Sequence, residues 1–131
     1  MADDPHAVAI LDLLRADTVL KVCDGQVPDG VTVPYVVVYL YAQPMRGDDL
    51  TAMSRERKTR ATIHCVGETA ASARIVAKRV EDALLDKTPS IPGRVCWPIE
   101  GEYTQPPIRD EYTGVPTMDV ISTWVLKSKR I

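Results

Sequence analysis

Apolar residues along this chain follow two different periods, and the changes of period divide it into helices and strands. Helical spacing holds over 5–15 and again over 69–86. Asp4 can cap the first helix, and Pro5 fits the first helical position, where no backbone donor is needed. The predicted buried stripes are Ala7, Ile10, Leu11 and Leu14 in the first helix, and Ala73, Val76, Ala77, Val80, Ala83 and Leu84 in the second.

Runs of β-branched and aromatic residues predict five strands between and after these helices. They cover 19–23, 35–41, 58–66, 93–99 and 115–127. In the last strand, the core face is expected to carry Met118, Val120, Trp124 and Leu126. This order of elements indicates an α+β fold, with a mostly antiparallel sheet and two helices packed on it. No repeat or linker divides the chain, so residues 1–131 are expected to form a single domain.

The strand at 35–41 is apolar on both of its faces. Because alternate residues of a strand point to opposite sides, one side carries Val36, Val38 and Leu40, and the other carries Tyr35, Val37, Tyr39 and Tyr41. A strand covered on one side only would alternate with polar residues. We therefore expect the tyrosine side to be covered by a helix of this chain or by a neighbouring subunit.

Two stretches lack a hydrophobic period and are rich in turn residues. The first, 43–57, contains Pro44, Gly47 and scattered charges, and predicts a long mobile loop. The second, 100–114, predicts a hairpin tip or an ordered loop. Loops longer than about 12–15 residues are uncommon in compact domains unless they are functional or disordered. Both stretches are therefore candidate contact surfaces.

Composition and charge narrow the class of protein. The 131 residues are 45% hydrophobic and 26% charged, the usual balance of a globular domain. A net charge of −2 argues against a dedicated nucleic-acid binder. Three cysteines without a C-x-x-C pair argue against a disulfide framework and against structural zinc. No signal peptide and no membrane-spanning run are expected, so we predict a protein of the reducing cytoplasm without a membrane partner.

Candidate catalytic and metal-binding residues form no recognisable pattern. His64 and Cys65 are adjacent, so on a strand they point to opposite faces, and Cys65 is expected in the core. His64 is expected at the surface or at an interface, and His6 has no evident partner. The acidic pairs at 48–49 and 110–111 lack the ligand number of a cation site. Because no common nucleotide, hydrolase or zinc-protease signature occurs, we expect no enzyme activity, no cofactor and no metal.

A basic cluster is the most prominent charge feature of the sequence. It comprises Arg55, Arg57, Lys58 and Arg60, where the loop 43–57 joins the next strand. Such a cluster can be a solvated strand end, or it can contact an acidic partner or passing DNA. Four charges without interleaved aromatic residues are weak evidence for specific nucleic-acid binding.

Several segments resemble a known family in their order and spacing. Residues 22–28 (VCDGQVP) and 34–38 (PYVVV) are similar to the opening of small phage tail-completion proteins, which reads hydrophobic-x-D-G-x-x-P and then P-Y-V-V. Residues 62–70 (TIHCVGETA), followed by a helix that ends in 83–85 (ALL), also resemble that family, in which a strand ends in a G-x-T turn. The likeness covers most of the chain, and its individual motifs are turn glycines and buried aliphatic residues.

The resemblance implies a tail terminator of long-tailed phages. Such a protein is a structural part of the virion and forms a ring, typically of six subunits, on the head-proximal end of the tail tube. The ring stops the tube from growing and joins the tail to the head connector or head-closure protein. DNA passes through its lumen. The implied fold is a sheet with packed helices, the implied place of assembly is the host cytoplasm, and the family has no catalytic residues.

We hypothesise three contact surfaces: the loop 43–57 against a neighbour or the tail tube protein, the loop 100–114, and the tyrosine side of 35–41 between subunits. The candidate interface residues are Tyr39, Tyr41, Arg46, Arg55, Arg57, Lys58, Arg60, Tyr103, Arg109 and Tyr112. Three alternatives stay open: another neck protein (a head-closure or adaptor subunit), a ligand-binding or enzymatic α+β domain, and a nucleic-acid module. A closed apolar pocket with convergent polar groups would favour the second, and steeply salt-dependent binding to nucleic acid the third.

Overall fold

The computed structural model describes residues 3–42, 56–110 and 117–131 of the chain. Its elements run in the order α1 (Pro5–Arg15), β1 (Val22–Asp24), β2 (Tyr35–Ala42), β3 (Glu56–Gly67), α2 (Ala70–Leu84), β4 (Arg94–Cys96), β5 (Glu100–Thr104), β6 (Ile108–Asp110) and β7 (Thr117–Arg130). Two helices and a mostly antiparallel sheet confirm the predicted α+β fold.

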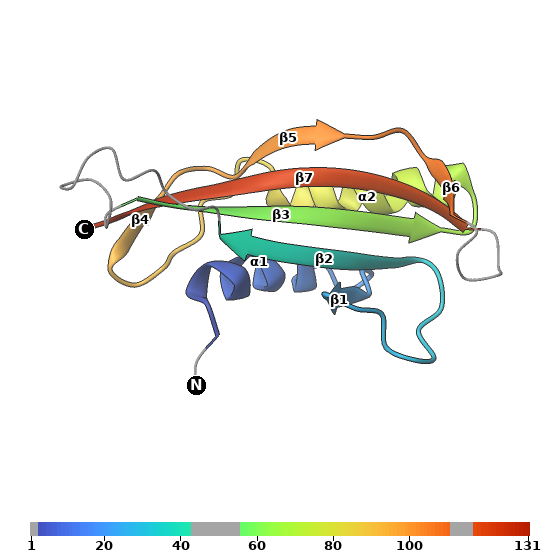
Figure 1. The fold of residues 1–131 in the computed structure, drawn as a ribbon, viewed down its shortest axis with the longest axis horizontal. Helices are drawn as coiled ribbons and strands as arrows, with labels where there is room; N and C mark the ends of the chain where they lie inside the picture. The colour runs from blue at the N-terminus through green and yellow to red at the C-terminus, as the bar shows by residue number, and fades with distance from the viewer. Residues whose placement is uncertain (1–2, 43–55, 111–116) are drawn as a thin grey trace.

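The described strands form one sheet, with β3 and β7 at its centre (Figure 1). β2 pairs with β3, and β3 with β7, both antiparallel, while the short β1 lies parallel to β2 at one edge. The other side of β7 pairs in turn with β4, β5 and β6. Three short strands therefore depend on a single long one for their place in the sheet.

Both helices pack on the same face of the sheet and bury the core there. Figure 1 shows α2 behind β3 and β7, and α1 alongside β2. The core comprises Ile10, Leu11 and Leu14 of α1, Ala73, Val76, Val80 and Leu84 of α2, and Val36, Val38, Ala61, Ile63, Cys65, Val120, Trp124 and Leu126 of the strands. The predicted helical stripes are confirmed, except that Ala7, Ala77 and Ala83 are only partly buried. On the last strand the predicted core face is confirmed too, with Met118 partly buried.

The turn from β3 into α2 is tight, and Gly67 permits it. A Cβ atom at this position would lie 2.6 Å from the Ala73 backbone nitrogen and 2.7 Å from Ser72 Oγ. Thr69 follows as the N-cap of α2, and its hydroxyl accepts a hydrogen bond from the Ser72 amide at 3.1 Å. The G-x-T segment therefore begins a helix that packs directly on the end of a strand.

Two predicted loops contain strands. β3 begins at Glu56, so Arg57 belongs to a strand and not to the loop 43–57, because it pairs with Ser128 of β7. Residues 43–55 lie outside the described part of the chain. The stretch 100–114 was expected to be a loop or hairpin tip, but 100–104 and 108–110 are strands paired with β7. All five residues of β5 are exposed, so no apolar alternation marks it in the sequence.

Other boundaries differ by a few residues. The first strand begins at Val22 and not at residue 19, and the helix predicted at 69–86 covers Ala70–Leu84. The strand predicted at 93–99 is limited to Arg94–Cys96. The last strand continues to Arg130, because its basic end pairs with β3 and β4.

Candidate assembly surface

The sheet face opposite the helices has no covering layer among the described elements. Cross-strand neighbours share a face, and in register Tyr39 faces Thr62, Thr62 faces Thr123, and Thr123 faces Tyr103. We call this the open face. Its described residues by register are Tyr35, Val37, Tyr39, Tyr41, Glu56, Lys58, Arg60, Thr62, His64, Val66, Val95, Glu100, Tyr103, Ile108, Asp119, Ile121, Thr123, Val125, Lys127 and Lys129.

Three tyrosines project from the open face into solvent. Tyr39 and Tyr41 on β2 are 45% and 46% exposed, and Tyr103 on β5 is 59% exposed. One expectation for 35–41, cover of the tyrosine side by a helix of this chain, is therefore wrong, since both helices lie on the other face (Figure 1). A tyrosine suits a surface that is wet in one state and buried in another, because its ring is apolar and its hydroxyl can hydrogen-bond. Cover by a neighbouring subunit stays a prediction.

An ion pair crosses β7 near the middle of the open face. Arg60 on β3 and Glu102 on β5 lie on either side of β7, and Arg60 Nη2 donates to Glu102 Oε1 at 2.8 Å. Val125 of β7 faces Arg60 in register and is buried, although it lies on the open face. Hydrogen bonds to Glu102 and, more weakly, to Tyr41 raise the pKa of Arg60. The predicted contact residue Arg60 is thus fixed in place and charged.

A histidine–aspartate contact lies further along this face. His64 Nδ1 is 2.8 Å from Asp119 Oδ2, and the Tyr39 ring meets the His64 ring edge-on, with 5.5 Å between their centroids. Asp119 is buried, and its Oδ1 has no hydrogen-bond partner in the described structure. A buried carboxylate oxygen without a donor is costly in free energy. This oxygen is therefore an acceptor that a donor from a neighbouring molecule could satisfy.

The end of the open face near the C-terminus is basic. Lys58 on β3 directly faces Lys127 on β7, and β7 continues with Lys129 and Arg130. Like charges directly opposite each other destabilise a sheet. Within the described residues neither Lys58 nor Lys127 makes an ion pair or side-chain hydrogen bond. A groove of about 420 Å³ at this end is lined by Glu56, Arg57, Lys58, Trp97, Glu100, Lys127 and Ser128.

Arg57, a predicted contact residue, has a partner within the chain. Its guanidinium contacts the carboxylate of Asp4, and Asp4 also accepts a hydrogen bond from the His6 amide at 2.9 Å as the N-cap of α1. Arg57 therefore fixes the start of α1 to β3. Lys58, its neighbour on the opposite face, is the member of the predicted basic cluster that stays unpaired among the described residues.

His6 has partners that its position in the sequence does not reveal. It is buried, with Nε2 at 2.6 Å from Ser128 Oγ and Nδ1 at 3.3 Å from Asp4 Oδ1. Ser128 Oγ also accepts a hydrogen bond from Arg94 Nε at 2.7 Å, so the serine proton is directed to His6. Burial is the main cause that lowers the pKa of His6, against the opposing effect of Asp4. The ring is therefore neutral at pH 7.

In this cluster a carboxylate contacts an imidazole, which contacts a hydroxyl. A hydrolase triad has the same order of groups. Ser128, however, is fully buried, and Arg94 occupies one side of its hydroxyl. A substrate carbonyl cannot reach such an oxygen. The cluster joins α1, β3, β4 and β7 and acts as a structural clamp.

None of the remaining predicted contact residues is found beside the tyrosines in the described part of the chain. Arg109 on β6 is exposed and faces Met118, towards the opposite end of β7 from Lys127. Arg46, Arg55 and Tyr112 lie outside the described residues. The structure thus brings Tyr39, Tyr41, Lys58, Arg60 and Tyr103 onto one face and leaves Arg109 apart from them.

Cys65 lies in the core as predicted, and burial raises the pKa of its thiol to about 12. A thiol in that state is inert as a nucleophile. In the described ranges, no three His, Cys, Asp or Glu side chains are grouped so that they could hold a metal ion. No helix in these ranges is long and apolar enough to cross a membrane.

Helices on one face and exposed tyrosines on the other define a small α+β protein with an open sheet face. The family model of tail completion protein gp17 matches residues 8–107 of the chain. The protein belongs to this family, which makes it a structural protein of the tail completion class.

Solved structures share this fold. A chain from the virion of a native gene transfer agent (GTA) particle superposes with a TM-score of 0.72 at 20% identity, over 93% of this chain and 92% of that one. A second solved chain gives a TM-score of 0.61 at 18% identity, over 100% of this chain and 96% of that one. At these identities the likeness shows the fold alone. No curated protein matches the sequence.

Proposed function

We propose that this protein is a tail terminator, whose copies form a ring that caps the head-proximal end of a tail tube. The ring ends tube polymerisation and joins the tail to the head connector. One observation carries the proposal: in this chain of the tail completion family, the described elements leave one sheet face uncovered, with Tyr39, Tyr41 and Tyr103 exposed. The fold is shared with a chain of a virion particle, which supports a place in the virion.

The open face suits contact between subunits. The core is complete on the helix side, so the tyrosines are not needed to stabilise a single copy. Aromatic residues are enriched in the centre of protein interfaces, where charged residues are depleted. On the open face, Arg60 near the tyrosines is paired with Glu102, and one Asp119 oxygen contacts His64. A neighbour can therefore cover Arg60 without burying an uncompensated positive charge.

The proposed role is structural and needs no catalytic group, cofactor or metal. The His6–Ser128 pair is sealed in the protein, and the Cys65 thiol is protonated. The proposed partners are other copies of the chain, the tail tube protein and the head-closure or connector protein. DNA passes through the lumen of the ring without specific binding.

Electron microscopy of the purified protein, alone and mixed with tail tubes, tests this function. We expect rings, and tubes of limited length that carry a distinct cap at one end. Copies that bind isolated head connectors but ignore tube ends would identify a head-closure or adaptor subunit instead. A monomer that binds neither would overturn the proposal.

The tyrosines provide a test at the residue level. The double variant Tyr39→Ser/Tyr41→Ser removes two half-exposed rings from β2, so we expect an unchanged melting temperature and at least about tenfold weaker ring formation, because aromatic anchors dominate interface energy. Native mass spectrometry over a concentration series measures the assembly. Ile75→Ser is the matched control, since Ile75 is 62% exposed on α2, away from the open face. Rings of normal stability in the tyrosine variant would show that the open face is not the subunit interface.

A further inference from the structure

Acidic and basic residues are concentrated in different regions of the chain. Residues 3–34 contain six acidic and two basic residues, whereas 56–60 and 117–131 together contain six basic and two acidic residues. The net charge of −2 conceals this separation. Because the sheet brings 56–60 next to the end of β7, the basic residues gather in space as well as in sequence.

Part of this charge is neutralised within the molecule. Asp4 contacts Arg57, and Asp17 accepts a hydrogen bond from Arg79 Nη2 at 2.9 Å. Asp12, Asp24 and Asp29 are exposed and make no ion pair in the described structure, and we call them the acidic edge. Half-buried Lys58 and exposed Lys127, Lys129 and Arg130 likewise make no ion pair there, and we call them the basic end.

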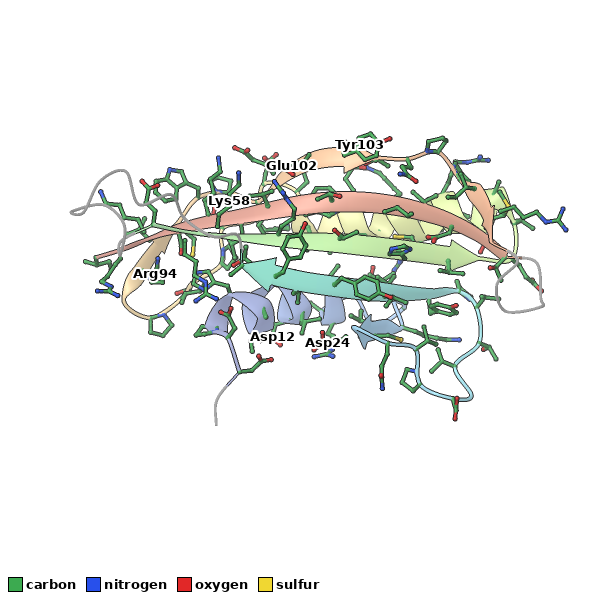
Figure 2. All side chains as sticks on the ribbon, viewed as in Figure 1. Asp12, Asp24, Lys58, Arg94, Glu102 and Tyr103 are labelled. Atoms are coloured by element: carbon green, nitrogen blue, oxygen red, sulfur yellow. The ribbon has the colours of Figure 1, made fainter. Side chains whose placement is uncertain are left out.

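The acidic edge and the basic end lie on different sides of the molecule. Figure 2 shows Asp12 and Asp24 along the side formed by α1 and β1, and Lys58 on the other side of β2, over β3 and β7. A single copy therefore cannot pair the two groups. Two copies can do so, if the acidic edge of one meets the basic end of the next.

The basic end also has a local reason to bind carboxylates. Lys58 and Lys127 directly face each other on neighbouring strands, where like charges repel, and neither makes an ion pair within the described structure, although Glu56 and Glu100 line the same groove. The nearby carboxylates are placed elsewhere in register, with Glu56 opposite Lys129 and Glu100 opposite Val125. An incoming carboxylate between the two lysines would replace repulsion with attraction.

We propose that the acidic edge of one copy docks on the basic end of the next copy in a head-to-tail contact. The inference rests on the proposed ring and names the surfaces that meet in it. A contact between two different patches repeats around a ring when the rotation closes. The basic end is continuous with the tyrosines, because Tyr41 faces Arg60, two residues from Lys58 on the same face. Charge at such a contact fixes register and speeds encounter more than it adds affinity.

Charge reversal tests the contact, with ring formation followed by native mass spectrometry at low salt. The variant Lys58→Glu/Lys127→Glu puts two carboxylates in place of the two facing lysines of the basic end, and Asp12→Lys/Asp24→Lys makes the acidic edge basic. We expect each variant alone to form rings at least about tenfold less readily than the unchanged protein, because like charges then meet at every contact. An equal mixture of the two should form rings again, with the variants in alternation. Recovery by mixing also proves that both variants are folded.

The matched control is Arg74→Glu/Lys87→Glu, which changes the net charge equally at exposed positions outside both surfaces and should assemble normally. If the unchanged protein forms rings and both reversed variants do so equally well, the inference is overturned while the ring proposal stands. Loss of rings that mixing does not restore would also overturn it. If the unchanged protein forms no ring under any condition, the ring proposal fails and the inference falls with it.

Discussion

At Gly67 the lack of a side chain decides how β3 joins α2. An added Cβ would meet the backbone of Ser72 and Ala73, which a rotamer change cannot move. We expect Gly67→Ala to lower the free energy of unfolding by about 1–3 kcal/mol, the usual cost of overpacking. Urea denaturation measures it, with Ala71→Ser as a comparison, because Ala71 is exposed in the first turn of α2. An unchanged midpoint in Gly67→Ala would show that α2 can shift without cost.

Burial of His6 makes the stability of the protein depend on pH. Its pKa in the folded protein is below the ordinary value of 6.5, so the unfolded chain binds a proton first as the pH falls. The stabilising contribution is therefore complete above pH 6.5 and decreases below it. We expect urea midpoints to decline between pH 7.5 and pH 5.5, and to decline less in His6→Gln. Equal declines in both proteins would assign the pH dependence to another group.

At the scale of elements, one hydroxyl connects parts that are distant in sequence. Ser128 on β7 contacts His6 at the start of α1 and Arg94 on β4. Ser128→Ala would remove the hydrogen bond of Ser128 to buried His6 and that to half-buried Arg94, and we expect it to cost about 1–3 kcal/mol of stability. Hydrogen exchange should show the loss first at the start of α1 and in β4. Ser90→Ala, at an exposed site, is the control, and equal exchange in both variants would contradict the clamp.

The sequence predicts an element well when burial gives it a period. Both helices carry apolar stripes against the sheet, and β2 carries a continuous apolar run, so their existence and type are evident. β5 and β6 are not evident, because they are short, polar and held at the edge by pairing with β7. The beginning of β3 is concealed for the same reason, since its charged residues become a strand only by pairing with the end of β7.

The candidate surface was predictable only in part. The tyrosine side of 35–41 is evident from its double apolar pattern, although its exposure within the single chain is not, and the basic cluster is visible as a run of charges. The ion pairs that cross strands, such as Arg60 with Glu102, depend on register between residues 42 positions apart. The opposition of Lys58 and Lys127 depends on register too, and no local signal indicates it. The role of Arg57 as a partner of Asp4 is concealed in the same way.

At the scale of the whole molecule, the sheet separates two tasks. One face, with α1 and α2, stabilises the fold, and the other carries exposed tyrosines and unpaired charge. Substitutions on the two faces should therefore have different effects. Those on the helix side should change the melting temperature, and those on the open face should change the state of association at constant melting temperature.

The hydrophobic core lies between the helices and one sheet face of a single chain, and this affects the order in which folding and association occur. A chain whose hydrophobic interior closes without a neighbour can reach its native state alone, so folding and association are successive steps. Under the proposed function, copies would accumulate as finished monomers while tails are still growing. The moment at which the proposed ring forms would then be set by the concentration of monomers, through mass action, and not by the timing of synthesis.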